Sequence, residues 1–498
     1  MNWRASLSSA PAGRRQADAT VDRRKRRALA LALAVAALAG GCALRPPGER
    51  EERQRIAEAG RPYVEVELLE VPLLPENPGP EDYLHCAFFA NADLQARYWE
   101  WAAAIERVPQ VSSWPSVALP FSFMLSPSNM KLWDRTTLGL ANDPMTNIPF
   151  PTKLSAAGQQ ALQEARAAGL RFEAAKFLLQ GRVLSTYYDL ALLAESLHIQ
   201  EENLSLLRLI ARQAAVRVET AAGSQPDLLR AQTELDLAQN NLANLKSQVA
   251  PAVAKLNALL GRPADAPLPL PAALPPPRSL PLPDDQVILV GSQRSPELAA
   301  LARDVAGRED ALRLAQQAYL PDFGLSFSIT GNTSQTVGGM LVLPTRFEAI
   351  QAGIGQARAG IRAVEAARRQ YERDLAASFV LNLSVLRNDE RQVALFEDTI
   401  IPRARETVRV AQAAYAVGRI PFADLAEAQR TLLDARLAVA QLRTEREKAL
   451  AAIETWSAVD VEALAPGRIS VWGAGMSSRP KPSPGSSAPG AAMGGSMP

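Results

Sequence analysis

The sequence contains very little histidine and cysteine. Only two residues of each type occur among 498. A histidine-based catalytic triad or a cysteine/histidine metal site would therefore have very few residues to draw on. No glycine-rich phosphate loop or nucleophile motif stands out either. We therefore predict no catalytic residues, no metal site and no cofactor, and we expect that the protein is not an enzyme.

A large excess of charge of one sign is also missing. The chain has 54 basic and 52 acidic side chains, which gives a formal net charge of +2. Nucleic-acid-binding proteins usually carry a strongly basic surface, so a nucleic-acid partner is disfavoured. Hydrophobic residues make up 47% of the chain, which is enough to build a large buried core.

The N-terminus has the pattern of an export signal. Five basic residues, 23–27, precede an apolar run from Ala28 to Leu38, and small residues lead to Cys42. The run is shorter than the roughly 20 residues that a membrane-spanning helix needs. The arrangement resembles the lipobox of bacterial lipoproteins, which predicts a signal peptide over 1–41 and acylation of Cys42. A simple cleaved secretory peptide is the alternative.

The rest of the chain is a tandem duplication of one unit. Its parts are a first repeat over 83–262, a proline-rich connector over 263–285, a second repeat over 286–460 and a disordered tail over 461–498. Residues 42–82 form an N-terminal extension before the first repeat. The recurring motifs are Pro151-Thr152-Lys153 with Pro344-Thr345-Arg346, Gly223 with Gly418, and Leu228–Gln232 with Leu425–Gln429.

Each repeat contains a predicted pair of β-strands. Large apolar residues alternate with small or polar ones. This period of two is typical of a strand with one apolar and one polar face. Turn-forming residues separate the members of each pair. The predicted strands are 116–125 and 135–142 in the first repeat, and 322–330 and 337–343 in the second.

A very long helical pattern follows each strand pair. It runs over about 152–221 in the first repeat and 345–417 in the second, which corresponds to rods of roughly 100 Å. Each rod ends at a turn and a second helix returns. The turns contain Gly223 with Pro226, and Gly418 with Pro421.

The returning helices carry five consecutive heptads in the same register in both repeats. This pattern predicts that each helix packs antiparallel on its rod as a coiled coil. Pro251 and Pro402 should kink their helices without ending them. The seam is interrupted at Arg446. Its members are Leu228, Ala231, Leu235, Ala238, Leu242, Leu245, Val249, Ala252, Leu256 and Leu259, then Leu425, Ala428, Leu432, Ala435, Val439, Leu442, Ala449, Ile453 and Trp456.

Four strands cannot form a closed sheet by themselves. In lipid, a four-stranded sheet would leave two unpaired edges, and the smallest single-chain barrels have about eight strands. Two chains would supply eight strands, whose interior side chains fill, whereas three chains would supply twelve and leave a lumen. We therefore predict a homotrimer with a 12-stranded barrel. The fold class is mainly α with a small β part.

Three segments resemble the TolC family of outer-membrane factors, and the resemblance covers nearly the whole mature chain. They are Ala414–Gly418, Phe422–Arg430 and Leu256–Arg262. The resemblance implies a trimeric efflux channel in the outer membrane, lipid-anchored and surrounded by outer-membrane lipid. An α-helical barrel would cross the periplasm, and a collar would form from the connector and terminal segments. It also implies docking onto a periplasmic adaptor and an inner-membrane pump.

The family also suggests a gate and a cargo. Family members carry acidic residues at the hairpin tip that close the periplasmic mouth, and the matching residues are Asp424 and Glu427. We expect Arg230 and Arg419 to latch the closed mouth by pairing with these carboxylates or nearby backbone, and Tyr415 to pack at the hinge. Alternatively, the two acids only cap their helix and face water.

Some predictions remain open at this point. The Pro-Thr-Lys/Arg motifs and Ile401–Arg403 are most similar to the heavy-metal (CusC/CzcC-like) branch, so the small solutes exported could be metal cations or drugs. One alternative is a lipid-anchored coiled-coil scaffold without a conduit, which would leave the strand pairs without a purpose. Another is the exit duct of a type I protein or peptide secretion system.

Overall fold

The structure is a computed structural model of the chain. It describes residues 43–64, 74–124, 131–142, 147–221, 223–280, 282–331 and 334–459. The predicted signal peptide, Cys42 and the predicted tail lie outside the described residues.

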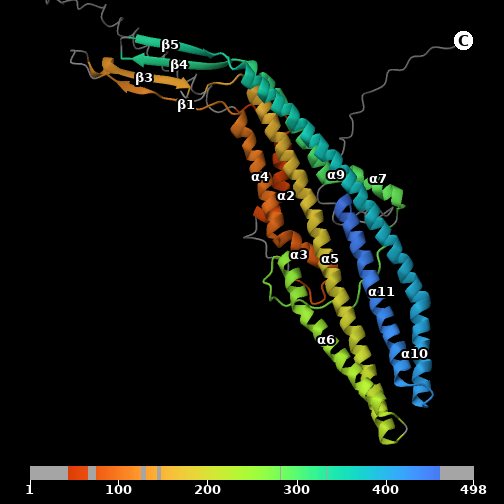
Figure 1. Cartoon of the computed structure of the whole chain (residues 1–498). Helices are drawn as coiled ribbons and strands as arrows, with labels where there is room; N and C mark the ends of the chain where they lie inside the picture. Colours follow the sequence, from red (N-terminus) through yellow and green to blue (C-terminus); the bar gives the residue numbers. More distant parts are fainter. Residues whose placement is uncertain are drawn as a thin grey trace, which may run out of the picture.

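The described chain is elongated and mainly helical. A small β-sheet occupies one end, long helices run away from it, and two helical hairpins form the opposite end (Figure 1). This arrangement agrees with the predicted fold class. Its strands are β1 (Val117–Ala118), β2 (Phe121–Phe123), β3 (Thr136–Asn142), β4 (Asp322–Thr330) and β5 (Ser334–Val342).

The strands form one antiparallel sheet in the order β1-β3-β4-β5, with β2 also paired to β3. The β3–β4 pair joins the two repeats, with Thr137 opposite Thr330 and Leu140 opposite Phe327. The hydroxyl groups of Thr137 and Thr330 lie 2.9 Å apart and share a hydrogen bond. The two strand pairs that the sequence predicts therefore lie side by side.

The first predicted strand is divided in the structure. Instead of one strand over 116–125, β1 and β2 stand on either side of Leu119 and Pro120. Pro120 accepts a hydrogen bond from the N–H of Gly139 through its carbonyl, but it has no N–H to donate in return. The strand β4 spans the residues that the alternating pattern predicts, whereas β5 begins three residues earlier than predicted.

The helices repeat in the same order in both halves. The N-terminal helix α2 (Glu49–Val64) precedes them. The first half contains α3 (Pro80–Ala90), α4 (Ala92–Ser112), α5 (Pro151–Glu219) and α6 (Gln225–Leu259). The second half contains α7 (Asp284–Arg294), α8 (Pro296–Gln316), α9 (Phe347–Leu395), a π-helical segment (Phe396–Ile400), α10 (Ile401–Ala416) and α11 (Phe422–Ser457). Short 3₁₀ turns cover Leu132–Arg135 and Gln317–Tyr319.

The two predicted rods differ in continuity. The first rod is the single helix α5, which is 69 residues long. The second consists of α9, the π-helical segment and α10, with Pro402 in the first turn of α10. Because proline removes one backbone donor, the hydrogen-bonding pattern shifts just before it. Pro251, by contrast, lies within α6, which continues through it.

The predicted heptad seams are covered in the structure. Every seam residue named above is buried or half-buried, on α6 and on α11 alike. The helix α6 packs on α5, whereas α11 packs on α5, α9 and α10. Arg446, the predicted interruption, is also buried, with 9% of its surface exposed, because it takes part in a cluster of ion pairs described below.

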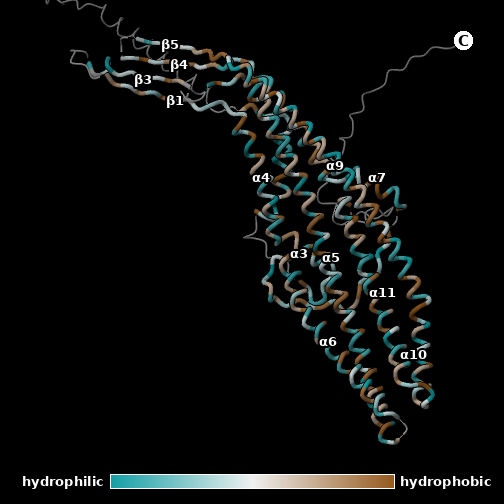
Figure 2. Tube along the Cα trace, viewed as in Figure 1, coloured by the Kyte–Doolittle hydropathy of each residue, from teal (hydrophilic) through white to brown (hydrophobic). Residues whose placement is uncertain are grey.

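No helix among the described residues is both long enough and apolar enough to cross a membrane. Figure 2 shows why: hydrophobic and hydrophilic residues alternate along the helices, and no long apolar stretch builds up. The large exposed apolar side chains include many in or beside the strands. They include Leu119, Phe121, Met124, Leu325, Val337, Met340, Leu341 and Leu343.

Candidate functional site: the hairpin tips

The two helical hairpins end close to each other, at the end of the molecule remote from the sheet (Figure 1). One tip joins α5 to α6, and the other joins α10 to α11. The tips contain the residues that the sequence predicts as a gate. Local sequence explains how each turn forms.

The first tip is stabilised by hydrogen bonds on both sides of the turn. Ala221 has a positive φ of 58°, and the N–H of Gly223 donates to the carbonyl of Arg217 at 2.8 Å. The Ser224 hydroxyl then caps α6 by accepting from the N–H of Asp227 at 3.3 Å. Pro226 lies in the first turn of α6, where its missing N–H costs nothing.

The second tip ends α10 with a Schellman motif. Gly418 has a φ of 77°, a conformation that glycine adopts easily. Its N–H donates to the carbonyl of Tyr415 at 3.0 Å, and the N–H of Arg419 donates to that of Ala414 at 2.9 Å. Pro421 is the N-cap of α11. Gly223 and Gly418 thus lie in the turns, and Pro226 and Pro421 lie where α6 and α11 begin.

A small hydrophobic core holds the two tips together. Tyr415 and Phe422 pack edge to face, with ring centroids 6.1 Å apart. Both are almost fully buried, together with Ile210 of α5 and Leu425 of α11. Burial raises the pKa of Tyr415 above its usual value. Tyr415 therefore packs between the two tips, and its role at the hinge of a gate stays a prediction.

Arg217 also connects the tips, and the sequence did not single it out. Its guanidinium lies 4.7 Å from the centre of the Tyr415 ring, and its Nη1 donates to the Tyr415 carbonyl. A cation over an aromatic ring and a charge-assisted hydrogen bond thus join α5 to α10. A basic residue in the last turn of a predicted helix was the available signal, but only the packing identifies its partner.

The four charged residues predicted to form the gate are exposed. Asp424 and Glu427 lie at the start of α11, Arg230 lies on α6 and Arg419 lies in the turn. Within the described part of this single chain, no ion pair or side-chain hydrogen bond joins these arginines to these acids. Both interpretations, a gate formed between subunits and simple solvent-facing acids, therefore remain predictions.

Exposed ion pairs connect the hairpins farther from the tips. Arg430 of α11 pairs with Glu234 of α6, and Arg436 of α11 pairs with Glu202 of α5 at 2.7 Å. The hydrogen bond from Arg436 lowers the pKa of Glu202. Such pairs are weak individually and are screened by salt.

A buried cluster of charges holds the C-terminal part of α11 in place. Arg278 of the proline-rich connector lies 3.0 Å from Glu447 and 2.8 Å from Glu454. Arg446 lies 2.5 Å from Glu447 and donates to the Arg278 carbonyl. The Tyr188 hydroxyl also donates to Glu447, at 3.4 Å. The connector is therefore tied to α11 by charges that are mostly buried.

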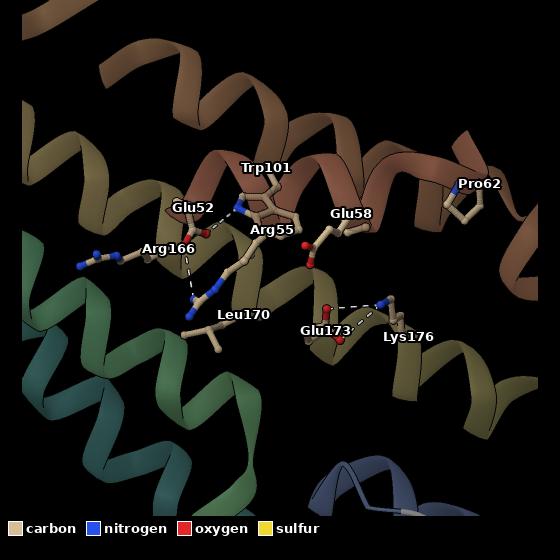
Figure 3. Close-up of a pocket in the computed structure, with 11 residues that line it drawn as sticks. Glu52, Arg55, Glu58, Pro62, Trp101, Arg166, Leu170, Glu173 and Lys176 are labelled. Atoms are coloured by element: carbon tan, nitrogen blue, oxygen red, sulfur yellow. Dashed lines mark hydrogen bonds and ion pairs between the residues drawn. The ribbon is translucent and has the colours of Figure 1, made fainter. Parts of the chain in front are cut away.

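A groove of about 550 Å³ separates the N-terminal helix α2 from α5 (Figure 3). On one wall, the indole N–H of Trp101 donates to Glu52 at 3.0 Å, and Arg55 lies 3.5 Å from the same carboxylate. On the other, Lys176 lies 3.3 Å from Glu173. The groove therefore has a mixed charge, and most of its charged groups are already paired. We assign the groove a structural role in the packing of α2 against α5.

No group of three or more metal-ligating side chains occurs among the described residues.

Comparison with known proteins connects these features to a family. The family model described as "Outer membrane efflux protein" matches residues 90–262 and 292–458. Its two segments correspond to the two repeats. No curated protein sequence matches the chain.

Several solved structures share the fold. The outer membrane protein VceC from Vibrio cholerae has a TM-score of 0.65 at 16% identity, covering 77% of this chain and 97% of its own. The MtrE outer membrane channel of Neisseria gonorrhoeae has a TM-score of 0.63 at 18% identity, covering 77% and 89%. CusC has a TM-score of 0.61 at 17% identity, covering 76% and 91%. At such low identity these likenesses concern the fold.

Proposed function

Because the chain belongs to the outer membrane efflux protein family, we propose that it is the outer-membrane exit duct of a tripartite efflux system. Family membership also places it among transport conduits and not among enzymes. In our proposal, three copies form a 12-stranded barrel in the outer membrane, and their helices extend into the periplasm. There they meet a periplasmic adaptor and an inner-membrane pump.

The sheet is the observation that carries this proposal. Among the described residues, its four-stranded path ends in two open edges, at β1/β2 and at β5, and apolar side chains on its strands are exposed. Unpaired backbone groups are unacceptable in lipid. Pairing with further copies would satisfy these groups, and lipid would cover the apolar side chains. A coiled-coil scaffold in water would gain nothing from such a sheet.

The lipid anchor completes the membrane assignment. Acylation of Cys42 would place the start of α2 close to the inner leaflet of the outer membrane. The acyl chains would add to the attachment that the barrel itself provides. Mass spectrometry of the mature N-terminus tests this step: a Cys42→Ser variant should lose the acyl mass and, if the lipid matters only for anchoring, should still assemble.

The tips are the proposed periplasmic gate. In a trimer, Asp424 and Glu427 of three copies would bring six acidic groups toward one axis, which favours cation binding. Arg230 and Arg419 would pair across copies or with backbone, and the Arg217–Tyr415 contact would keep the two tips of each chain together. Charge repulsion among the acids would then oppose closure.

Single-channel conductance in a planar bilayer tests both duct and gate. The wild-type trimer should conduct poorly and be blocked by divalent cations from the periplasmic side. Replacing Asp424 and Glu427 by Ala should weaken that block and change the conductance. The matched control is Asp434→Ala, an exposed acid farther along α11. Unchanged conductance together with unchanged block would remove the gate, and absence of any conductance would favour the scaffold.

The cargo is a separate part of the proposal. The Pro-Thr-Lys/Arg motifs and Ile401–Arg403 favour heavy-metal cations, with drugs as the second class of small solute. A deletion strain complemented with the wild-type gene distinguishes them: metal export predicts restored tolerance to copper or silver, and drug export predicts restored tolerance to antibiotics. Restoration of secretion of a polypeptide would instead support a type I secretion duct.

A further inference from the structure

The two open edges of the sheet have a defined hydrogen-bonding phase. In an antiparallel pair, alternate residues turn their backbone N–H and C=O groups toward the partner strand, and the others turn them away. Pro120 and Met124 bond to β3, through Gly139 and Arg135 respectively. The odd-numbered residues Leu119, Phe121 and Phe123 therefore turn their backbone groups to the open edge. Pro120 lacks an N–H, but its backbone faces β3, so no hydrogen-bond donor is missing from the open edge.

The same reasoning applies to the opposite edge. Gly331 bonds to Thr136 and Phe323 bonds to Ile148, so the odd-numbered residues of β4 face β3. The even-numbered residues of β4 must then face β5, where Gly324 stands opposite Met340. It follows that the odd-numbered residues of β5, Val337, Gly339 and Leu341, turn their backbone groups outward.

The repeat provides a template for joining these edges. Residues 115–123 align with 321–329, since Pro115, Leu119, Phe121 and Ser122 recur as Pro321, Leu325, Phe327 and Ser328. On the second strands, Thr137-Leu138-Gly139 recurs as Thr336-Val337-Gly338. Inside the chain, β3–β4 thus joins the second strand of one repeat to the first strand of the other. The two open edges are formed by the same two kinds of strand: β5 is the second strand of its repeat, and β1/β2 is the first strand of its repeat.

We propose that β5 of one copy pairs antiparallel with β1/β2 of the next copy in the register of the β3–β4 pair. Leu138 opposite Ile329 and Leu140 opposite Phe327 become Val337 opposite Phe123 of the partner subunit and Gly339 opposite Phe121 of the partner subunit. Leu341 then faces Leu119 of the partner subunit. This inference rests on the proposed assembly of several copies, and it adds the residue-level interface.

The side chains support this register. Val337, Leu341, Leu119 and Phe121 are all exposed in the single chain, at 81, 54, 76 and 69%, and the register places them on one face of the combined sheet. It also sets an aromatic ring over a glycine, a cross-strand pair that compensates for the missing side chain. A slip of one residue would turn every side chain to the other face.

The helices repeat the same junction beneath the sheet. The helices α4, α5, α8 and α9 pack in that order, and Arg171 of α5 bonds to Asp304 and lies 3.7 Å from Glu297 of α8. Both α4 and α8 are 21 residues long. The acid–alanine–acid stripe Glu297, Ala300 and Asp304 recurs on α4 as Asp93, Ala96 and Glu100, which are exposed. The outer side of α4 is therefore built like the side of α8 that meets a neighbouring rod.

Disulfide trapping in the membrane-extracted full-length protein tests the register. The register places Val342 opposite Ala118 of the partner subunit as a pair without mutual hydrogen bonds, where Cα atoms lie about 4.5 Å apart and a disulfide fits. In a Cys86→Ser background, Val342→Cys with Ala118→Cys should form covalent trimers after mild oxidation. The matched control, Met340→Cys with Ala118→Cys, keeps the same face but shifts the pairing by two residues. It should crosslink at least tenfold less.

The outcomes separate the register from the assembly. A disulfide within one chain is excluded because three strand spacings of about 4.8 Å separate the two edges. Equal or stronger crosslinking of the control pair would overturn the register. A protein of trimeric mass in which neither pair crosslinks would also overturn it, while leaving the proposed function intact. A monomeric mass for the uncrosslinked protein would instead overturn the proposed function.

Discussion

The two hairpins are copies of one unit, yet they are packed differently. The first consists of the unbroken helix α5 and the helix α6, which packs mainly against α5 and leaves most of its surface exposed. In the second, α11 lies between α5 and the rod formed by α9 and α10 (Figure 1). The same heptad pattern therefore ends up on an outer helix in one repeat and on a central helix in the other.

This difference explains where the buried polar groups lie. The central helix α11 buries Gln429, Arg446, Glu447 and Glu454, whereas the buried residues of α6 are almost all apolar. A buried charge or amide needs a partner, and removing that partner is costly. Substitutions at equivalent positions should thus have larger effects in the second hairpin than in the first.

Breaking the buried ion cluster should have the largest effect. Glu447 accepts hydrogen bonds from Arg278 and Arg446, so Glu447→Gln leaves two largely buried cations with less compensating charge. We expect a loss of about 3–5 kcal/mol in the free energy of unfolding, measured by urea denaturation followed by circular dichroism. Glu406→Gln removes an exposed partner of Arg409 on α10 and should leave the midpoint unchanged. Equal effects of Glu447→Gln and Glu406→Gln on the free energy of unfolding would contradict the expected difference between the buried and the exposed ion pair.

Truncating equivalent seam leucines should have the next largest effect. Leu425 is 1% exposed, whereas its counterpart Leu228 is half-buried. Leu425→Ala should cost about 2–5 kcal/mol because it leaves a cavity in the tip core. Leu228→Ala should cost clearly less in the same denaturation experiment. If Leu228→Ala proved the more damaging, α6 could not be the outer helix.

Replacing a buried amide should stabilise the second hairpin. Both polar atoms of the Gln429 side chain are buried without a hydrogen-bond partner among the described residues, and its counterpart Gln232 is exposed. Gln429→Leu should therefore raise the free energy of unfolding by about 1–3 kcal/mol. Gln232→Leu should change it by less than about 0.5 kcal/mol. Destabilisation by Gln429→Leu would show that the amide has a partner in the assembly.

A buried acid should give the smallest effect, a change in pH dependence. Burial, and then the charge of Glu445, raise the pKa of Asp389 on α9 above its usual range. Its contribution to stability is thus fully present below an unfolded-state pKa of about 3.9 and is lost as pH rises through the folded-state pKa. Asp389→Asn should remove this loss and make the protein more stable at neutral pH.

The control for that prediction is Asp398→Asn, because Asp398 is exposed in the π-helical segment. Denaturation midpoints should be compared for the three proteins from acidic to neutral pH. A wild-type profile parallel to that of Asp389→Asn throughout the range would rule out the proposed role of this carboxyl group.

The sequence by itself determined the periodic elements. The position of β4, the two rods, the heptad seams and the glycine turns follow from local rules: side chains alternate along a strand, recur every three to four residues along a helix, and glycine tolerates a positive φ. These rules involve neighbouring residues only, so one sequence is enough to apply them. The tandem repeat extended the same prediction to the second half.

Tertiary structure alone decided which copies of a pattern become central. Arg446 looks like a defect in its heptads, and Arg217 looks like an ordinary helix-ending residue. Arg446 donates to the carbonyl of Arg278 and Arg217 donates to the carbonyl of Tyr415, and both of these partners lie far away in the sequence. Pairing over such distances depends on how α11 fits between α5 and α9, and no local period encodes that fit.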